Sequence, residues 1–342
     1  MQYRQLGSSD LKVSVVGLGG NVYGPPRLTQ EQTVASLNHA IEKGINFLDT
    51  AIGYGEGQSE VFIGNALQGK RDKMLIATKF VVRNRKEGVS VQDHILAQAD
   101  ESLRKLRTDH IDLYQIHQPD PAVPEEPIME ALAKLVQAGK VRWTGECNYA
   151  AWRHAVSNAI AEKNGWPKMV SSQNHYNVLR RHVELEILPY CERFNIGFLP
   201  YFPLAGGFLT GKYQPGQPPP PGSRGAEGSG IIAKARNAGN EAVLAKLEAY
   251  CKERGHTVLE LAVSWLLAHK AIPSVIAGTS SAAQIDANIA SAGWKITPEE
   301  MAEIDRIAAW DGTNETVDGS QPGQFGARAG LNRQQQGAQA AR

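Results

Sequence analysis

The sequence predicts an α/β fold, a (β/α)8 TIM barrel with an N-terminal β-hairpin and a long loop after the seventh strand. Over its 342 residues, eight short apolar runs rich in β-branched residues alternate with amphipathic helical stretches. The runs are apolar throughout rather than alternating, as expected of parallel strands that are buried on both faces. Eight strand–helix units over roughly 250 residues fit a barrel better than a doubly wound sheet.

The expected elements follow one another in a regular order. A hairpin is expected over residues 3–13, with its turn at Gly7-Ser8-Ser9-Asp10. The strands are expected at Val13–Leu18, Asn46–Asp49, Met74–Lys79, Ile111–His117, Val141–Gly145, Met169–Gln173, Gly197–Tyr201 and Ser274–Ala277. Start signals and amphipathic patterns place helices between several of them, at Thr29–Lys43, Ser90–Leu106, Glu125–Ala138 and Tyr149–Lys163.

Residues 1–312 are expected to form one barrel domain that is interrupted by a loop excursion at 202–239. The stretch Gln214–Gly230 holds five Pro and five Gly in seventeen residues, so it cannot be a regular element. It is either an idle surface insertion or a ligand-binding loop, and its place after a barrel strand favours binding. The Gly- and Gln-rich tail at 313–342 has little to bury, so we expect it to be flexible.

Composition excludes several classes of protein. With 36 Lys and Arg against 35 Asp and Glu, the chain lacks the basic excess of a nucleic-acid binder. No apolar run approaches the ~18–20 residues that cross a bilayer, and no signal peptide is visible, so we expect a soluble, cytoplasmic protein without a membrane partner. Cys147, Cys191 and Cys251 are far apart, which argues against disulfides and against a metal site.

Common catalytic and nucleotide-binding motifs are absent. The nearest match to the dinucleotide fingerprint is Gly17-Leu18-Gly19-Gly20-Asn21-Val22, which has Val where the third Gly belongs. The sequence also contains no P-loop, no H-E-x-x-H and no G-x-S-x-G. Any chemistry must therefore be assembled from the ends of several strands.

Three polar residues end consecutive predicted strands: Asp49, Lys79 and His117. Because the C-terminal ends of barrel strands converge on one mouth, we expect these side chains to lie together. Tyr54, in the loop after Asp49, could reach the Lys79 ammonium. A single strand-end charge is more often a rim residue or half of a structural ion pair, but three in consecutive strands are harder to explain in that way.

Together, these four residues could act as a general acid toward a carbonyl group. A phenol titrates near pH 10 unless a neighbouring cation stabilises the phenolate, and Lys79, held by Asp49, can do so for Tyr54. His117 would either donate to a substrate oxygen or relay the proton. Protonation of a carbonyl oxygen without a metal or a nucleophile favours hydride transfer, which requires a nicotinamide.

These and further motifs resemble those of the aldo-keto reductase superfamily. The matching segments are Asp49-Thr50-Ala51-Ile52-Gly53-Tyr54-Gly55 with Ser59-Glu60, Ala77-Thr78-Lys79, Ile116-His117, Gln173-Asn174-His175-Tyr176-Asn177, residues 201–213, and Ile276-Ala277-Gly278-Thr279-Ser280-Ser281 with Gln284 and Asn288. The resemblance extends from Tyr3 to about Ala308. It implies a barrel oxidoreductase that uses NADP(H) and acts on a small carbonyl or alcohol, with Tyr54 as acid or base, Lys79 and Asp49 tuning it, and His117 orienting the carbonyl.

The resemblance also implies a set of cofactor-binding residues. Asn148 and Gln173 would hold the nicotinamide carboxamide, and Tyr201 would stack on the ring, although Tyr201 could also be ordinary core. The remaining positions carried over are Gly20, Asn21, Asp49, Cys147, Pro203, Leu204, Gly206, Lys212, Arg224, Gly278, Ser280, Gln284 and Asn288. Of these, Gly206 to Lys212 with Arg224 would approach the pyrophosphate, and the last three would face the adenosine. Gln284 and Asn288 could instead be a solvated pair on a helix.

Two departures from the family pattern affect the expected cofactor. Cys147 stands where relatives usually have Ser beside the nicotinamide, and residues 278–288 contain no Lys or Arg to hold a 2′-phosphate. Binding of NAD(H) as well as NADP(H) therefore stays open.

The substrate and its pocket are less defined by the sequence. Tyr23, Phe80 and Trp152 are expected to line the substrate pocket, or else to be simply core. Neither the substrate nor a homo-oligomer can be predicted. This branch of the family also resembles the β subunits of potassium channels, so a cofactor-binding sensor is the alternative function.

Overall fold

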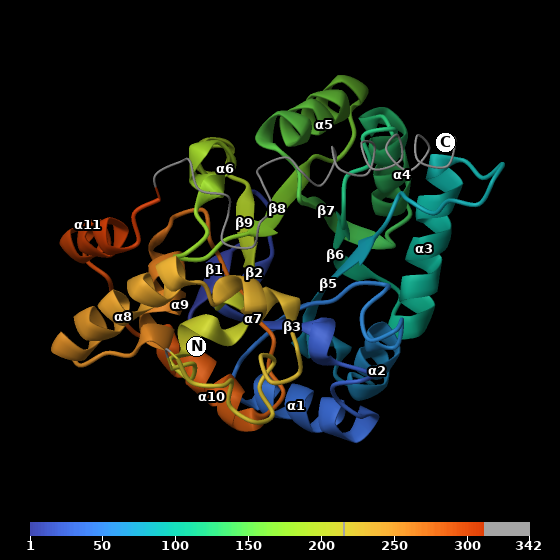
Figure 1. Cartoon of the computed structure of the whole chain (residues 1–342). Coiled ribbons are helices and arrows are strands. Elements are labelled where there is room, and N and C mark those ends of the chain that lie inside the picture. Colours follow the sequence, from blue (N-terminus) through green and yellow to red (C-terminus); the bar gives the residue numbers. More distant parts are fainter. Residues whose placement is uncertain (215, 311–342) are drawn as a thin grey trace, which may run out of the picture.

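The computed structural model describes residues 1–214 and 216–310, in which eight parallel strands roll into a barrel (Figure 1). The strand order is β10-β3-β4-β5-β6-β7-β8-β9. The strands are β3 (Val16–Gly19), β4 (Phe47–Asp49), β5 (Leu75–Phe80), β6 (Ile111–Ile116), β7 (Val141–Cys147), β8 (Met169–His175), β9 (Gly197–Tyr201) and β10 (Val275–Ala277). Because the edge strands β9 and β10 lie against each other, the barrel is nearly closed. The predicted fold class is confirmed.

A hairpin of β1 (Tyr3–Gln5) and β2 (Lys12–Ser14) precedes the barrel, as predicted. Its apolar residues pack inside the barrel, in a cluster that contains Leu6, Leu11, Val13, Phe47, Leu113, Val170 and Leu199. The hairpin turn needs glycine at position 7, because φ is +54° and a Cβ there would lie 2.4 Å from the Val170 carbonyl oxygen. The hairpin therefore closes one end of the barrel.

The expected strand Val13–Leu18 is divided into two in the structure. β2 ends at Ser14 and β3 begins at Val16. The Ser14 hydroxyl donates to the Val16 carbonyl oxygen at 2.7 Å, and the Ser14 backbone N–H donates to the Asn46 side chain at 2.7 Å. These local bonds turn the chain from the hairpin into the barrel, which a continuous apolar run could not reveal.

Helices cover the outside of the barrel (Figure 1). They are α1 (Gln30–Glu42), α2 (Ser59–Ala66), α3 (Val91–Leu106), α4 (Glu125–Gln137), α5 (Ala151–Asn164), α6 (Ile187–Phe194), α7 (Gly230–Ala235), α8 (Ala238–Glu253), α9 (Val258–Ala268), α10 (Ala282–Ser291) and α11 (Pro298–Ile307). Short 3-10 helices lie at η1 (Gly20–Val22), η2 (Arg71–Lys73), η3 (His182–Leu185) and η4 (Ala205–Thr210). Thr29 and Ser90 cap α1 and α3 through their side chains, which agrees with the predicted starts.

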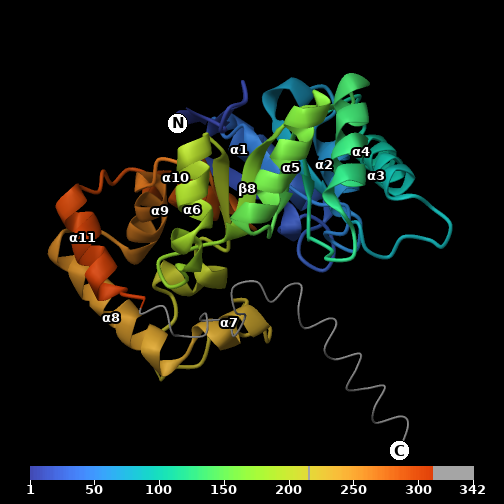
Figure 2. The ribbon, with the colours of Figure 1, turned by 90° about the horizontal axis from the view of Figure 1, so that it is seen from above.

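The expected excursion at 202–239 contains η4, α7 and the first residues of α8. Residues 214 and 216–229 form no helix or strand. Figure 2 shows α7 at the opposite end of the barrel from the N-terminus, where the strands end. The predicted tail at 313–342 lies outside the described residues. Within the described part of the chain, no helix is long and apolar enough to span a membrane.

Candidate active site

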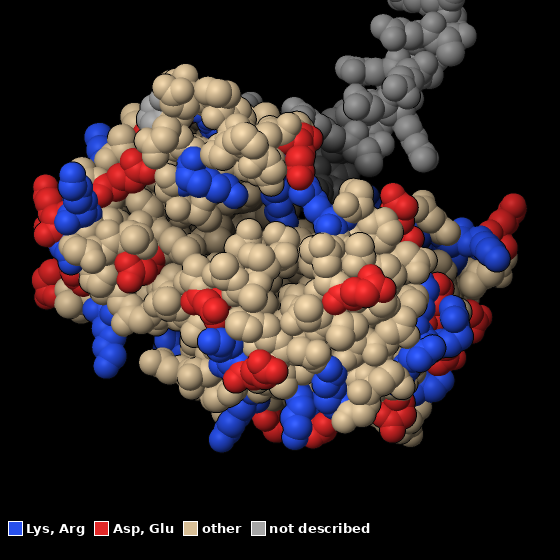
Figure 3. Space-filling model, turned by 90° about the horizontal axis from the view of Figure 1, so that it is seen from below, with Lys and Arg blue, Asp and Glu red and all other residues tan. Residues whose placement is uncertain are grey.

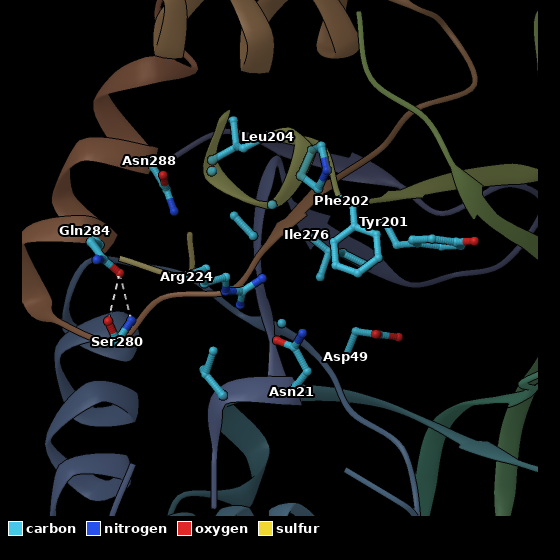
Figure 4. A pocket seen from close by; sticks show the side chains of 18 of the residues that line it. Asn21, Asp49, Tyr201, Phe202, Leu204, Arg224, Ile276, Ser280, Gln284 and Asn288 are labelled. Atoms are coloured by element: carbon cyan, nitrogen blue, oxygen red, sulfur yellow. Dashed lines mark hydrogen bonds between the residues drawn. The ribbon is translucent and has the colours of Figure 1, made fainter. Parts of the chain in front are cut away.

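A cavity of about 580 Å³ opens at the C-terminal ends of the strands. With the exception of Lys79, every residue predicted to be catalytic or to bind the cofactor lines it: Gly20, Asn21, Asp49, Tyr54, His117, Cys147, Asn148, Gln173, Tyr201, Pro203, Leu204, Gly206, Lys212, Arg224, Gly278, Ser280, Gln284 and Asn288. Figure 4 shows how side chains from the barrel, the excursion and α10 point into this space. Segments far apart in the sequence therefore form one site.

Asp49 and Lys79 form a buried ion pair at one end of the cavity. Asp49 is the last residue of β4, and the Lys79 ammonium donates to its Oδ2 at 2.5 Å and to the Thr50 carbonyl oxygen at 2.8 Å. Lys79 is completely buried and lies beneath the cavity wall. Residues two apart on a strand share a face, and Ala77, two residues earlier on β5, belongs to the interior cluster, so the Lys79 side chain also points into the barrel.

The rings of Tyr54 and His117 lie close to this ion pair. The Lys79 nitrogen is 5.0 Å from the centroid of the Tyr54 ring, and the Tyr54 and His117 rings meet edge-on with centroids 5.6 Å apart. Tyr54 is carried by the loop between β4 and α2, and His117 directly follows β6. The structure thus brings together all four residues that were predicted to be catalytic.

The electrostatics of this group differ in one respect from the sequence-based expectation. Burial raises the pKa of Tyr54, and the Lys79 charge only partly opposes that rise. Burial disfavours the charge on Lys79, but the Asp49 carboxylate, together with the neighbouring Tyr54 and Cys147, more than offsets burial, and the pKa of Lys79 is raised. We expected Lys79 to bring the phenol below its ordinary pKa; instead burial dominates, because the ring is almost fully removed from water.

His117 is neutral at physiological pH. Burial, followed by the nearby Lys79 charge, lowers the pKa of His117 to about 3. A neutral imidazole carries one N–H and can donate one hydrogen bond through it. Of the two roles expected for His117, the structure therefore favours donation to an oxygen over transfer of a proton.

Side-chain amides surround the floor of the cavity beside this group. The Gln173 amide nitrogen donates to Asp49 Oδ1 at 3.0 Å, and the Cys147 thiol lies 3.5 Å from the other end of that amide. Asn148, in the left-handed region at φ 63°, accepts from the Tyr201 hydroxyl at 2.8 Å and donates to the His117 carbonyl oxygen at 3.0 Å. Asparagine tolerates this backbone conformation better than most residues.

Basic side chains without an acidic partner lie farther along the cavity. Lys212 and Arg224 line it, and neither has a hydrogen bond or an ion pair with another described residue. Burial, followed by the nearby Arg27 charge, lowers the pKa of Arg224. Figure 3 shows a hollow with Lys and Arg side chains along its upper border, while charges of both signs are mixed over the rest of that face.

Glycines and polar side chains complete this part of the cavity. Gly206 and Gly207 have φ of 72° and 107°, so the turn before Lys212 depends on residues without a side chain. Ser280 donates to the Gln284 side-chain oxygen from its backbone nitrogen at 2.8 Å and from its hydroxyl at 3.2 Å (Figure 4). Gln284 and Asn288 lie one turn apart on α10 and both line the cavity; Gln284 is exposed there, whereas Asn288 is buried.

The three residues expected in the substrate pocket do not line the cavity. Tyr23 and Phe80 are completely buried, and Trp152 is 63% exposed on α5. The Tyr23 hydroxyl lies 3.3 Å from that of Ser36 on α1. Phe80 alternates with the inward Lys79 and therefore packs outward. The expectation used proximity in sequence to the strand ends and took no account of the direction of each side chain.

Other residues that line the cavity were given no role in the site by the sequence analysis, although Phe202 and Ile276 lie within the motifs that it matched. Arg27, Gln118, Phe202 and Ile276 all contribute to its wall. Gln118 and Phe202 directly follow the predicted residues His117 and Tyr201, so position after a strand end was an available signal. Arg27 pairs with Glu227 of the excursion, 200 residues away, and nothing local in the sequence announces that contact.

Comparison with known proteins shows which family the sequence resembles. The model of the aldo/keto reductase family matches residues 15–309. The chain is 33% identical to a versiconal hemiacetal acetate reductase of Aspergillus parasiticus, over 89% of this chain and 96% of that protein. It is 31% identical to the aldo-keto reductase YhdN of Bacillus subtilis strain 168, over 90% and 93% of the two chains.

A third relative has a different kind of name. A putative voltage-gated potassium channel subunit beta of Schizosaccharomyces pombe is 33% identical, over 89% of this chain and 92% of that protein. The family model and the reductase-named relatives support an oxidoreductase, and they confirm the resemblance that the motifs indicated. This chain belongs to the aldo-keto reductase family.

Proposed function

We propose that the protein reduces the carbonyl group of small aldehydes or ketones, or oxidises the corresponding alcohols, with NADP(H) as its cofactor. The observation that carries this proposal is the way in which polar and charged side chains are divided between the two ends of the cavity. One end holds Tyr54, His117 and the Asp49–Lys79 ion pair, and the other holds unpaired basic side chains. That division suits an extended anionic cofactor whose reactive end meets a proton donor.

The residues present fit a nicotinamide dinucleotide. Lys212 and Arg224 are cations that face the cavity without a carboxylate partner among the described residues, as a site for phosphates requires. The glycine turn at Gly206 and Gly207 leaves backbone accessible beside them. Asp49 is the one carboxylate that lines the described cavity, and its charge is already paired with Lys79.

The bound cofactor would supply the hydride, and the chain would supply the proton. Tyr54 would give its hydroxyl proton to the carbonyl oxygen, and the Lys79 ammonium would stabilise the phenolate that remains. Asp49 keeps Lys79 charged in a buried position. Neutral His117 would donate its N–H to the same carbonyl oxygen and so orient the substrate.

The remaining cavity residues would bind the cofactor in sections. Asn148 and Gln173 would contact the carboxamide, because a side-chain amide both donates and accepts. Tyr201 would offer its ring face to the nicotinamide. Gly206, Lys212 and Arg224 would hold the pyrophosphate, and Ser280, Gln284 and Asn288 would face the adenosine. Gly20, Asn21, Cys147, Pro203, Leu204 and Gly278 would complete the wall.

The preference for NADP(H) over NAD(H) rests on the basic residues around the excursion. Residues 278–288 contain no Lys or Arg. Arg27 and Arg224 lie close enough for one to affect the other's pKa, and both line the cavity. Arg27 is therefore the first candidate to hold the additional phosphate of NADP(H), and Arg224, assigned above to the pyrophosphate, lies near enough to contribute to both.

A second candidate function follows from the relative named as a channel subunit. The chain could bind the cofactor and turn over so slowly that it acts as a sensor. Tyr54, Lys79, Asp49 and His117 lie together as the proposed proton transfer requires, which favours the enzyme. The two functions differ in turnover but share cofactor binding.

The proposal is tested with purified protein, NADPH and NADH, and a panel of aldehydes and ketones. Wild type should bind NADPH more tightly than NADH and consume it with at least one carbonyl. Tyr54→Phe should lose about 10²-fold or more of this turnover and bind NADPH nearly as well, because the phenol acts on the substrate oxygen. Unchanged turnover in Tyr54→Phe would overturn the mechanism, and tight cofactor binding without turnover in wild type would favour the sensor.

A further inference from the structure

Gln115 is a buried polar residue in the middle of the barrel that the mechanism above does not use. It lies on β6 and is completely inaccessible to water. Leu113, two residues earlier, belongs to the cluster inside the barrel, so Gln115 also points inward. An amide in such a place is costly unless its polar atoms are hydrogen-bonded.

Both ends of the Gln115 amide have a partner. Its nitrogen donates to Asp49 Oδ1 at 3.2 Å. Its oxygen accepts from the Ser171 hydroxyl of β8 at 3.3 Å. Because the hydroxyl donates to the oxygen, the nitrogen is left to face the carboxylate. Ser171 therefore fixes the orientation in which Gln115 stabilises a negative charge.

The contact between Gln115 and Ser171 passes over β7, which lies between their strands. Gly145 is the β7 residue opposite Gln115 in the sheet. A Cβ at Gly145 would lie only 2.0 Å from the Ser171 hydroxyl oxygen, so any side chain there would displace that hydroxyl. The absence of a side chain at position 145 is what lets Ser171 reach the Gln115 amide.

Asp49 consequently has three donors from three strands. Lys79 of β5 occupies one carboxylate oxygen, while Gln115 of β6 and Gln173 of β8 share the other. We propose that Gln115, oriented by Ser171, is a positioning residue that holds the Asp49 carboxylate in place for Lys79 and so keeps the ammonium beside Tyr54. This inference rests on the proposed function only for the consequence to turnover.

The two glutamines that contact Asp49 are not equivalent. Gln173 lines the cavity and is proposed above to contact the cofactor as well. Gln115 does not line the cavity, so a ligand cannot draw it away from Asp49. Of the two amides that donate to Asp49, Gln115 is therefore the one that a ligand in the cavity does not contact.

The charged and titratable groups around Asp49 determine what a carboxylate introduced at position 115 would experience. Lys79 is the cation that faces Asp49 from β5, and burial raises the pKa of the Cys147 thiol on β7 well above its usual range, so that thiol is neutral. Burial also raises the pKa of Tyr54. A second carboxylate introduced at 115 would therefore meet Asp49 as the negative charge nearest to it.

The first test measures stability in the protein without cofactor, using Gln115→Glu and Gln115→Met. In Gln115→Glu, the introduced carboxyl can still donate to Asp49 while it is protonated, whereas its ionised form places two carboxylates together. The pKa of the introduced carboxyl would be raised in the folded state. The folded variant therefore keeps its stability at low pH and loses it as pH rises through that raised pKa. The melting temperature of Gln115→Glu should fall, relative to wild type, between about pH 5 and pH 8, and that of Gln115→Met should not follow pH in this way.

Adding Asp49→Asn separates contact with Asp49 from burial alone. In the Gln115→Glu background it should remove most of the pH-dependent loss, because the repelling charge is gone. Gln98→Met is the matched control, since Gln98 is a buried glutamine on α3 whose amide bonds to the Val81 backbone. Its loss of stability should add to that of Asp49→Asn, as expected for sites that share no partner.

The second test measures turnover and cofactor binding. Gln115→Met should lower kcat by about 10-fold, the size expected for one hydrogen bond to a charged group, with a much smaller change in the NADPH dissociation constant. Gln115→Glu should retain activity at acidic pH and lose it as pH rises. Ser171→Ala should change kcat in the same direction as Gln115→Met but by less.

The outcomes distinguish this inference from the proposed function. If wild type lacks turnover with any nicotinamide cofactor, the proposed function fails, while the stability cycle still decides whether Gln115 holds Asp49. If wild type turns over but Gln115→Met matches it in kcat, and the effects of Gln115→Glu and Asp49→Asn simply add, the assignment of Gln115 is overturned.

Discussion

The two ends of the cavity are organised in different ways. At the Tyr54 end, Asp49, Lys79, Gln115 and Gln173 satisfy one another before any ligand arrives. At the other end, Lys212 and Arg224 face the cavity without a hydrogen bond or an ion pair to another described residue. The polar groups of the first end are hydrogen-bonded within the chain. The second end presents positive charges that are free to pair with an anionic ligand.

The elements that carry each end account for this difference. Asp49, Lys79, Gln115 and Gln173 lie on strands of one barrel, whose backbone hydrogen bonds fix their relative positions. Lys212 and Arg224 both lie on the excursion, in segments between η4 and α7 that belong to no helix or strand. A preorganised charge lowers the cost of reaching a transition state, whereas unpaired cations supply binding energy. Substitutions at the first end should therefore act on kcat, and those at the second on cofactor affinity.

The largest effect should come from Lys79→Met. It removes the cation proposed to stabilise the Tyr54 phenolate, so kcat should fall by about 10³-fold or more. Because it also leaves Asp49 buried without its partner, stability should fall by about 3–5 kcal/mol. Adding Asp49→Asn should recover stability without recovering kcat, as measured by thermal melting and steady-state kinetics.

A surface lysine provides the control for Lys79. Lys134 is half exposed and pairs with Glu130 at 2.7 Å, one turn earlier on α4. Lys134→Met should change stability by less than about 1 kcal/mol and leave kcat unchanged. A similar kcat in Lys79→Met and wild type would mean that the Tyr54 end does not carry the chemistry.

The same difference explains which parts of the site the sequence could predict. Asp49, Lys79 and His117 end or follow apolar strands, and barrel geometry alone brings such residues to one mouth. Trp152 does not line the described cavity, because its position on α5 turns it outward, with Arg153 buried beside it. Helical phase decides that direction, and proximity to a strand end does not.

Contacts between distant loops were beyond the reach of the sequence. The pair of Arg27 and Glu227 joins the loop after β3 to the excursion, and each residue alone is an ordinary surface charge. Nothing in the sequence around Ser171 marks it as a partner of Gln115, because their contact depends on Gly145 of the strand that lies between them. The register of a barrel creates such contacts, and register is set by the whole sheet.

Arg224→Met should have an intermediate effect, at the other end of the cavity. The loss of a charge-assisted hydrogen bond to phosphate should weaken NADPH binding by about 10-fold or more, with a much smaller change in kcat at saturating cofactor. Fluorescence titration with NADPH and NADH at two salt concentrations measures this loss. A larger loss for NADPH than for NADH would place Arg224 at the additional phosphate.

Arg236 is the matched control within the excursion. It pairs with Glu241 at 3.3 Å and does not line the cavity. Arg236→Met should therefore keep the NADPH affinity of wild type. Equal losses from both substitutions would show that the excursion's overall charge, rather than a placed guanidinium, attracts the cofactor.

The smallest effect should be seen in the response of folding to pH at the Tyr54 end. Burial and the Lys79 charge lower the pKa of His117 to about 3, against roughly 6.5 in an unfolded chain. Between these values the unfolded chain takes up a proton that the folded protein refuses, so His117 contributes stability above pH ~6.5 that is lost as pH falls. From about pH 7 to pH 5, wild type should lose about 1–2 kcal/mol more than His117→Gln.

Thermal melting of the two proteins at both pH values isolates His117, because every other titrating group is common to them. The same comparison bears on catalysis, since a histidine that stays neutral contributes no acidic limb to kcat between about pH 5 and pH 8. Equal loss of stability in the two proteins would mean that water and a proton reach His117 freely. The Tyr54 end would then be as open to water as the end that carries Lys212 and Arg224, and the contrast between the two ends would be lost.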